Sequence, residues 1–105
     1  MPSIAIEIVR FLSDDYPGFV AAELRDAFGR THTFEDKVPV LGLEDLTATS
    51  DYPRVGVLAC EIIERWVADD GRELARVHTE KPWDIPSTDG EYQFVVEASE
   101  LSLND

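Results

Sequence analysis

VGVLACEIIERWV, residues 55–67, is the stretch on which the predicted fold class depends. Its apolar pattern is compatible with both a helix and a strand, which would give different folds. A helix would gather its apolar residues on one stripe and would place Glu61 four residues before Arg65, where the two charges attract. A strand would gather fewer apolar residues on one face, and Glu64 would interrupt that face. The helical stripe consists of Val55, Leu58, Ala59, Ile62, Ile63, Trp66 and Val67, and the strand face of Leu58, Cys60, Ile62 and Trp66. Taken alone, the pattern slightly favours the helix.

The sequence that follows this stretch favours the strand. Residues 68–71, ADDG, are typical of a hairpin loop, with Gly71 at the position that needs a positive φ. Residues 73–80 then alternate with a period of two, which is the period of a half-buried strand. We therefore predict a strand over residues 55–67. A helix at residues 55–68, in an α+β fold, is the alternative.

Most of the remaining chain also alternates with the period of strands. Ile4, Ile6 and Ile8 alternate with other side chains, and DDYPG at residues 14–18 is dense in turn-forming residues. In the run that begins at residue 31, every second side chain is polar, which indicates a solvent face. That face consists of Thr31, Thr33, Glu35 and Lys37. Besides the segments discussed above, we predict strands over residues 4–9, 19–28, 31–40 and 91–100.

These segments predict an all-β fold with six antiparallel strands. Two three-stranded meanders would be joined by a loop over residues 41–53, with one helical turn around residues 43–46. A small barrel or a two-sheet sandwich would bury the apolar faces. The 105 residues are expected to form a single domain, with residues 101–105 frayed.

The charge balance constrains the function. The chain has 22 acidic and 9 basic residues, a net charge of −13, and the acids are spread between apolar residues. Such a domain is expected to be very soluble and is not expected to bind DNA, RNA or anionic lipid unaided. Apolar residues make up 44% of the chain, which indicates a folded domain rather than a disordered acidic segment.

The cysteine content and the first residues predict a cytoplasmic protein. Cys60 is the single cysteine, so no internal disulfide can form, and its apolar neighbours predict a buried residue. Glu7 and Arg10 interrupt the first apolar stretch, which does not match a signal peptide. No apolar run approaches the ~20 residues of a membrane span.

No motif in the sequence indicates catalysis, a metal or a cofactor. His32, His78 and Glu80 could share a metal only if their strands were adjacent, and no ligand spacing supports this, so both histidines are expected to be exposed or bonded at a strand edge. Adjacent carboxylates, such as Asp69 and Asp70, occur in turn sequences, where acids stay solvated, so they do not indicate a catalytic acid and base. We therefore predict no catalytic residue, no metal ligand and no cofactor, and we lean against an enzyme.

Three aromatic residues stand beside proline in predicted loops. They are Tyr16, Tyr52 and Trp83, and Asp84 follows the last of them. Aromatic side chains in loops stiffened by proline lose little entropy on binding, so these four residues are the candidate binding site. The alternative is structural, with the rings folding back over the open ends of the sheets.

Two classes of function remain. The first is a small acidic binding protein for a basic protein partner, such as an inhibitor or immunity-type protein that covers a surface built for phosphate. The second is a small-molecule-binding or enzymatic β-barrel with a pocket between the sheets. Self-association through an uncovered strand edge is compatible with either class.

Overall fold

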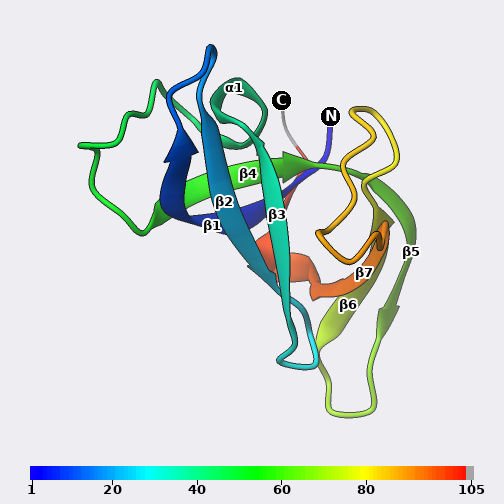
Figure 1. The fold of residues 1–105 in the computed structure, drawn as a ribbon. Helices are drawn as coiled ribbons and strands as arrows, with labels where there is room; N and C mark the ends of the chain where they lie inside the picture. Colours follow the sequence, from blue (N-terminus) through cyan, green and yellow to red (C-terminus); the bar gives the residue numbers. More distant parts are fainter. Residues whose placement is uncertain (104–105) are drawn as a thin grey trace.

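The protein folds into two antiparallel sheets on a common core, as a computed structural model of residues 1–103 shows (Figure 1). Within these residues, sheet A has the strand order β3-β2-β1-β4 with β8 also paired to β1, and sheet B has the order β5-β6-β7. Sheet A consists of β1 (Ser3–Ser13), β2 (Phe19–Arg25), β3 (Thr31–Lys37), β4 (Arg54–Ala59) and β8 (Leu101–Ser102), and sheet B of β5 (Glu61–Val67), β6 (Glu73–His78) and β7 (Gln93–Glu97). The all-β prediction is confirmed, and no helix forms at 55–68.

Residues 55–67 form two strands, so the prediction of one continuous strand was wrong. β4 pairs with β1 in sheet A, whereas β5 pairs with β6 in sheet B. The chain crosses between the sheets at Cys60, whose N–H donates to the carbonyl of Pro2 at 3.1 Å. In addition, a register shift between Ile62 and Glu64 breaks the alternation of β5. A single period could not describe this stretch, because its two halves belong to different sheets.

The helical turn lies earlier than the sequence predicted. β3 ends at Lys37, and α1 (Val38–Leu41) follows directly, with Pro39 in its first turn. A proline is favoured there because the first N–H groups of a helix have no partner within the helix. Residues 43–46, where the turn was expected, are not helical.

The two predicted meanders are present. β1, β2 and β3 pair in sequence, as do β5, β6 and β7, and Gly71 has a φ of +89° in the loop between β5 and β6. The end of the chain differs from the prediction, because a 3-10 turn (Ala98–Glu100) leads into β8 rather than into a frayed tail. Residues 104–105 of the tail that was expected to fray lie outside the described residues.

The core fills the space between the sheets. Phe34 of β3 meets Phe94 of β7 edge to face, with ring centroids 5.5 Å apart. Cys60 is buried as predicted, and burial, followed by the charge of Glu61, raises the pKa of its thiol to about 11. The largest fully buried side chains also include those of Ile4, Ile8, Leu24, Leu41, Leu58, Ile85, Val20, Val77 and Val96.

α1 lies against β4 through a glycine. A Cβ atom on Gly56 would stand 2.5 Å from the carbonyl oxygen of Leu41, a distance that real Cβ atoms do not reach. Glycine at this position therefore lets the backbone of α1 approach the sheet and fixes where the long connection to β4 begins.

In the described part of the chain, no helix is long and apolar enough to cross a membrane.

Candidate functional site

Tyr16 stands at the tip of the turn between β1 and β2. The N–H of Gly18 donates to the carbonyl of Asp15 at 2.6 Å, and the N–H of Asp15 donates to the Ser13 hydroxyl at 3.1 Å. These two bonds lie within the turn, and the N–H of Val38 in α1 also donates to the carbonyl of Gly18 at 2.9 Å. The side chain of Tyr16 is 96% exposed, and its peptide bond to Pro17 is cis.

Tyr52 has a different environment, at the end of the long connection between α1 and β4. Its ring packs against the core, and its hydroxyl donates to the carbonyl of Thr47 at 2.7 Å. Thr47 also bonds to Thr49 and Ser50, so residues 47–50 form a compact turn. Tyr52 thus holds the long connection in place, which is the structural role that the sequence left open for these rings.

The β1–β2 turn and the long connection enclose a hollow of about 410 Å³, which we call the tyrosine notch. Tyr16 lines the hollow from the turn and Leu46 lines it from the long connection. Asp14 is the one charged residue in the lining. The lining consists of Phe11, Asp14, Tyr16, Pro17, Gly18, Leu46, Thr47, Ala48 and Thr49. The fold therefore brings the segments of two of the predicted site residues together, with Tyr16 in the notch and Tyr52 bonded to its wall.

Trp83 and Asp84 lie on another connection, residues 79–92, on the opposite side of the view in Figure 1 from the long connection. Trp83 is 58% exposed. Asp84 has a φ of +56° and accepts a hydrogen bond of 2.7 Å from the Tyr92 hydroxyl, a bond that raises the pKa of Tyr92. The four predicted site residues are thus divided between two separate surfaces.

His32 lies on β3, an edge strand of sheet A, where it is bonded as one of the two expectations stated, but it is buried rather than exposed. It is 7% exposed, with Nε2 2.8 Å from Asp26 Oδ2 and Nδ1 3.3 Å from Glu91 Oε2, and its ring meets Phe94 edge to face. Both ring nitrogens therefore face carboxylates, which leaves neither nitrogen free to act as a general base. The sequence did not reveal this cluster, because Asp26, His32 and Glu91 come from three different segments.

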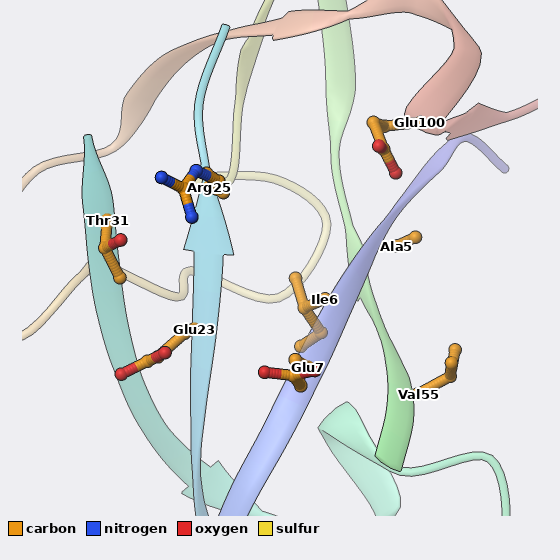
Figure 2. A pocket seen from close by; sticks show the side chains of 8 residues that line it. All are labelled: Ala5, Ile6, Glu7, Glu23, Arg25, Thr31, Val55 and Glu100. Atoms are coloured by element: carbon orange, nitrogen blue, oxygen red, sulfur yellow. The ribbon is translucent and has the colours of Figure 1, made fainter. Parts of the chain in front are cut away.

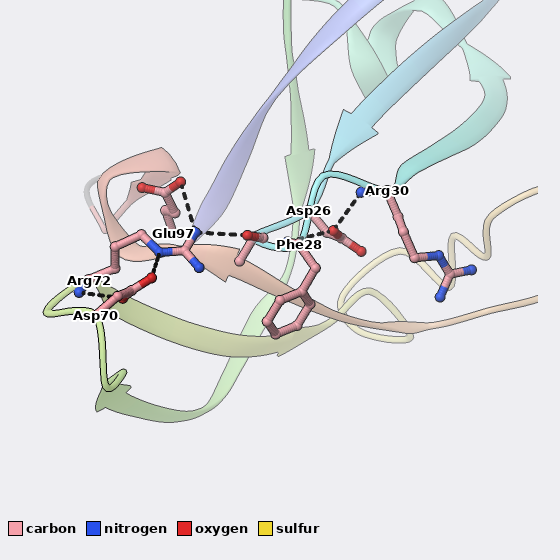
Figure 3. A network of polar contacts seen from close by, with 7 residues as sticks. Asp26, Phe28, Arg30, Asp70, Arg72 and Glu97 are labelled. Carbon is pink, nitrogen blue, oxygen red and sulfur yellow. Dashed lines mark hydrogen bonds and ion pairs between the residues drawn. The ribbon is translucent and has the colours of Figure 1, made fainter.

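Asp26 joins this cluster to the turn between β2 and β3. It accepts backbone N–H bonds from Phe28 and Arg30 (Figure 3). Burial raises the pKa of Asp26, but the bond to His32 and these two backbone bonds together outweigh burial and lower it below 3.8. The same turn contacts sheet B, where Arg72 stands between Asp70 and Glu97 and donates to the carbonyl of Ala27 at 2.8 Å (Figure 3).

The two histidines do not share a site. His78 lies in β6 beside Glu61, with 3.3 Å between Nε2 and Oε1, whereas His32 lies in β3 of the other sheet. Among residues 1–103, no group of three or more histidine, cysteine or acidic side chains is arranged to hold a metal ion.

A second hollow, of about 370 Å³, opens on the outer face of sheet A (Figure 2). Glu7 and Glu23 stand directly opposite each other on β1 and β2, and Glu100 and Arg25 complete its charged lining. Like charges placed directly opposite in a sheet repel each other. The sequence could not indicate this pair, because it depends on the register of two strands.

Protein-family profiles, curated proteins and solved structures were each compared with this chain, and none of them gives a match.

Proposed function

We propose that this protein binds a basic protein partner and that the tyrosine notch is part of the contact surface. The observation that carries the proposal is the fully exposed ring of Tyr16 beside a hollow whose lining includes Asp14 and no lysine or arginine. An inhibitor or immunity-type role is the special case in which the partner is an enzyme with a surface built for phosphate. Within this proposal the protein acts in the cytoplasm, since a single unpaired cysteine is compatible with a reducing compartment.

The geometry around Tyr16 suits an anchor residue. Its turn is held by internal hydrogen bonds, so docking would order little additional backbone. Large aromatic side chains next to a concave surface contribute much of the binding energy in protein interfaces. Tyr16 is therefore the residue of this surface whose loss should weaken binding most.

The charge of the region supports a cationic partner. Asp14, Asp15, Asp45 and Asp51 lie in the two segments that form or flank the notch, and no described residue is ion-paired with them. Unpaired surface carboxylates attract a basic partner over a distance of about one Debye length, roughly 8–10 Å at physiological salt. Such attraction raises association rates and selects partners by charge.

We do not propose the alternative function, a barrel that binds a small molecule between its sheets, because the core between the sheets is packed with side chains. The space between the sheets is occupied by Phe34, Phe94 and their aliphatic neighbours. Trp83 and Asp84 remain a second proposed contact surface, because Trp83 projects from a connection that Tyr92 and Asp84 hold together.

A titration of ¹⁵N-labelled protein with a hexa-arginine peptide tests the proposal, with hexa-glutamate as the control peptide. We expect amide shifts that cluster at residues 14–18 and 46–49 with the basic peptide alone. The association rate should fall steeply between 20 and about 150 mM salt. A rate that does not depend on salt, or shifts spread evenly over the surface, would contradict the proposal.

Self-association through the edge of β5 is a separate proposal. Within the described residues β5 pairs with β6 alone, and Ile63 and Val67 are exposed on it. An edge strand with exposed apolar side chains can pair with a second copy. Two chains of net charge −13 repel each other, so this association should strengthen with added salt, opposite to the binding of a basic partner.

Sedimentation velocity at low and high salt measures this association. Ile63→Lys should abolish a dimer that forms at high salt, because a charge on the strand edge opposes pairing. Leu43→Lys, at an exposed apolar residue in the long connection, is the matched control and should leave the dimer intact. A chain that stays monomeric at high salt and high concentration would overturn the idea.

A further inference from the structure

We infer that the tyrosine notch is a receptor for an arginine side chain of the partner. The inference rests on the proposed function and specifies the chemical group that the notch recognises.

The walls of the notch fit a side chain with an apolar stem. Phe11 contributes apolar surface from β1, and Leu46 and Ala48 contribute it from the long connection on the opposite wall. Leu46 is buried and Phe11 packs against the core, so this surface belongs to the folded body of the protein. The alkyl part of an arginine or lysine side chain covers apolar surface well while its charged end stays near water.

The charge of the notch selects a cation. Asp14 is the one charged residue in the lining, and its carboxylate has no hydrogen bond or ion pair with any described residue. Asp15 follows it in the same turn, and Asp45 precedes Leu46 on the other wall. An anionic side chain would be repelled by these carboxylates and a neutral one could offer them only hydrogen bonds, whereas a cation at the rim would also be attracted by charge.

The ring of Tyr16 discriminates between the two basic side chains. Because the ring is 96% exposed, its face is open to stacking by a partner. A guanidinium group is planar and weakly hydrated, so it can stack on an aromatic face and still offer N–H donors to a carboxylate. A lysine ammonium is also attracted to an aromatic face, but it is more strongly hydrated and has no planar group to stack on the ring. We therefore assign arginine, rather than lysine, to the notch.

The hollow on the outer face of sheet A does not fit this role equally well. Its lining includes Arg25 together with Glu7, Glu23 and Glu100 (Figure 2). A guanidinium group of the protein itself is thus already present among those carboxylates and would oppose a second one. The tyrosine notch has no such internal cation in its lining.

The test compares three short peptides with the same backbone: acetyl-Gly-X-Gly-X-Gly-amide, in which X is arginine, lysine or citrulline. Citrulline keeps the shape of arginine but has no charge. In ¹⁵N-resolved titrations at 20 mM salt, the arginine peptide should shift residues 14–18 and 46–49 and should bind at least about fivefold more tightly than the lysine peptide. The citrulline peptide should not shift these residues.

Variants identify the groups responsible. Tyr16→Ala should weaken the arginine peptide at least about fivefold, whereas Tyr16→Phe, which keeps the ring, should change its affinity less than about twofold. Asp14→Asn should weaken it, while Asp89→Asn, which removes the same charge from another loop, should not. Phe28→Ala, at an exposed aromatic residue in the turn between β2 and β3, is the aromatic control and should have no effect. Thermal unfolding verifies that each variant is folded, as the exposure of Tyr16 and Asp14 leads us to expect.

The failure of this inference and the failure of the proposed function give different results. If arginine and lysine peptides bind the notch equally, the arginine assignment is wrong and a basic partner remains supported. If the shifts appear around Glu7 and Glu23 or around Trp83, the notch is the wrong surface. If neither basic peptide binds even at low salt, both the arginine assignment and the proposed basic partner are overturned.

Discussion

Tyr16 and Trp83 each stand beside a proline in a connection between strands, yet the fold supports them differently. The Tyr16 turn is short and is closed by two hydrogen bonds of its own, with one further bond from the N–H of Val38 in α1 to the carbonyl of Gly18. The longer connection that contains Trp83 is bonded to other parts of the fold, since the N–H of Thr88 donates to the carbonyl of Thr33 and Glu91 contacts His32. Local turn bonds thus make up most of the support of Tyr16, whereas the Trp83 connection combines its own bonds with contacts to sheet A, and mutations should distinguish the two.

The largest expected effect is on the contact between α1 and β4, which lies where the long connection that lines the notch begins. Gly56→Ala should destabilise the protein by about 3 kcal/mol, because the new methyl group would meet the Leu41 carbonyl and the Ile8 side chain at 2.5–2.8 Å and force the backbone to shift. Urea unfolding measures this free energy. Val55→Ala, at the exposed residue just before Gly56, is the control and should change it by less than about 0.5 kcal/mol. A Gly56→Ala protein as stable as the wild type would contradict the close contact between the Leu41 carbonyl and β4.

Next in size is the difference between the two tyrosines of the notch region. Tyr52→Ala should cost about 2 kcal/mol of stability, since a partly buried ring and its bond to the Thr47 carbonyl are both lost. Tyr16→Ala should cost less than about 0.5 kcal/mol, because the ring is exposed. The two variants are compared by chemical unfolding under identical conditions. Equal losses would remove the distinction between a structural ring and an anchor.

A smaller, pH-dependent effect is expected at Asp26. This residue bonds to His32, which in turn contacts Glu91 in the connection that contains Trp83. Asp26→Asn should cost about 1.5 kcal/mol at pH 7, as is typical for a hydrogen bond to a charged group. The folded-state pKa of Asp26 is lowered below 3.8, so its contribution is present above the unfolded-state pKa of about 3.9 and is lost as the pH falls through the folded-state value. The stability difference between wild type and variant should therefore shrink below about pH 4.

Urea unfolding at pH 7, 5, 4 and 3 follows this difference. Asp89→Asn, at an exposed position in the same connection as Glu91, is the control and should have little effect on stability at any pH. A gap between wild type and Asp26→Asn that stays constant down to pH 3 would mean that the Asp26 charge does not hold this cluster together.

The smallest expected effect is at Trp83 itself. Trp83→Ala should change the free energy of unfolding by less than about 1 kcal/mol, because Trp83 is 58% exposed. In the Trp66→Phe variant, where Trp83 is the single tryptophan, emission should be red-shifted and readily quenched by iodide. A blue-shifted, protected emission, or a loss of about 3–5 kcal/mol in Trp83→Ala, would identify the ring as a structural plug.

Trp66 is less buried than its place on an apolar face in both interpretations of residues 55–67 predicts. Both interpretations of residues 55–67 would bury it, but β5 is an edge strand and the ring is half-buried, with Arg76 at 5.9 Å from its centroid. Its removal should therefore cost less than the loss of a core ring. Phe34, which is fully buried against Phe94, is the better reference for a core aromatic residue.

The sequence alone determined the features that depend on neighbouring residues. The period of two predicted the strands, the ADDG loop predicted a hairpin with a positive φ at Gly71, and Phe34 alternates with exposed Glu35 as expected. Turn chemistry and alternation act over a few residues, so they can be recognised without the rest of the fold.

The tertiary structure alone decided which segments meet. It divided residues 55–67 between two sheets at Cys60, placed Tyr16 beside Leu46, and enclosed His32 between Asp26 and Glu91. These outcomes depend on strand register and on contacts between residues far apart in the chain, and many weak interactions together select them. Local sequence predicts that Tyr16 stands in a turn, but only the packing of the long connection against that turn creates the notch beside it.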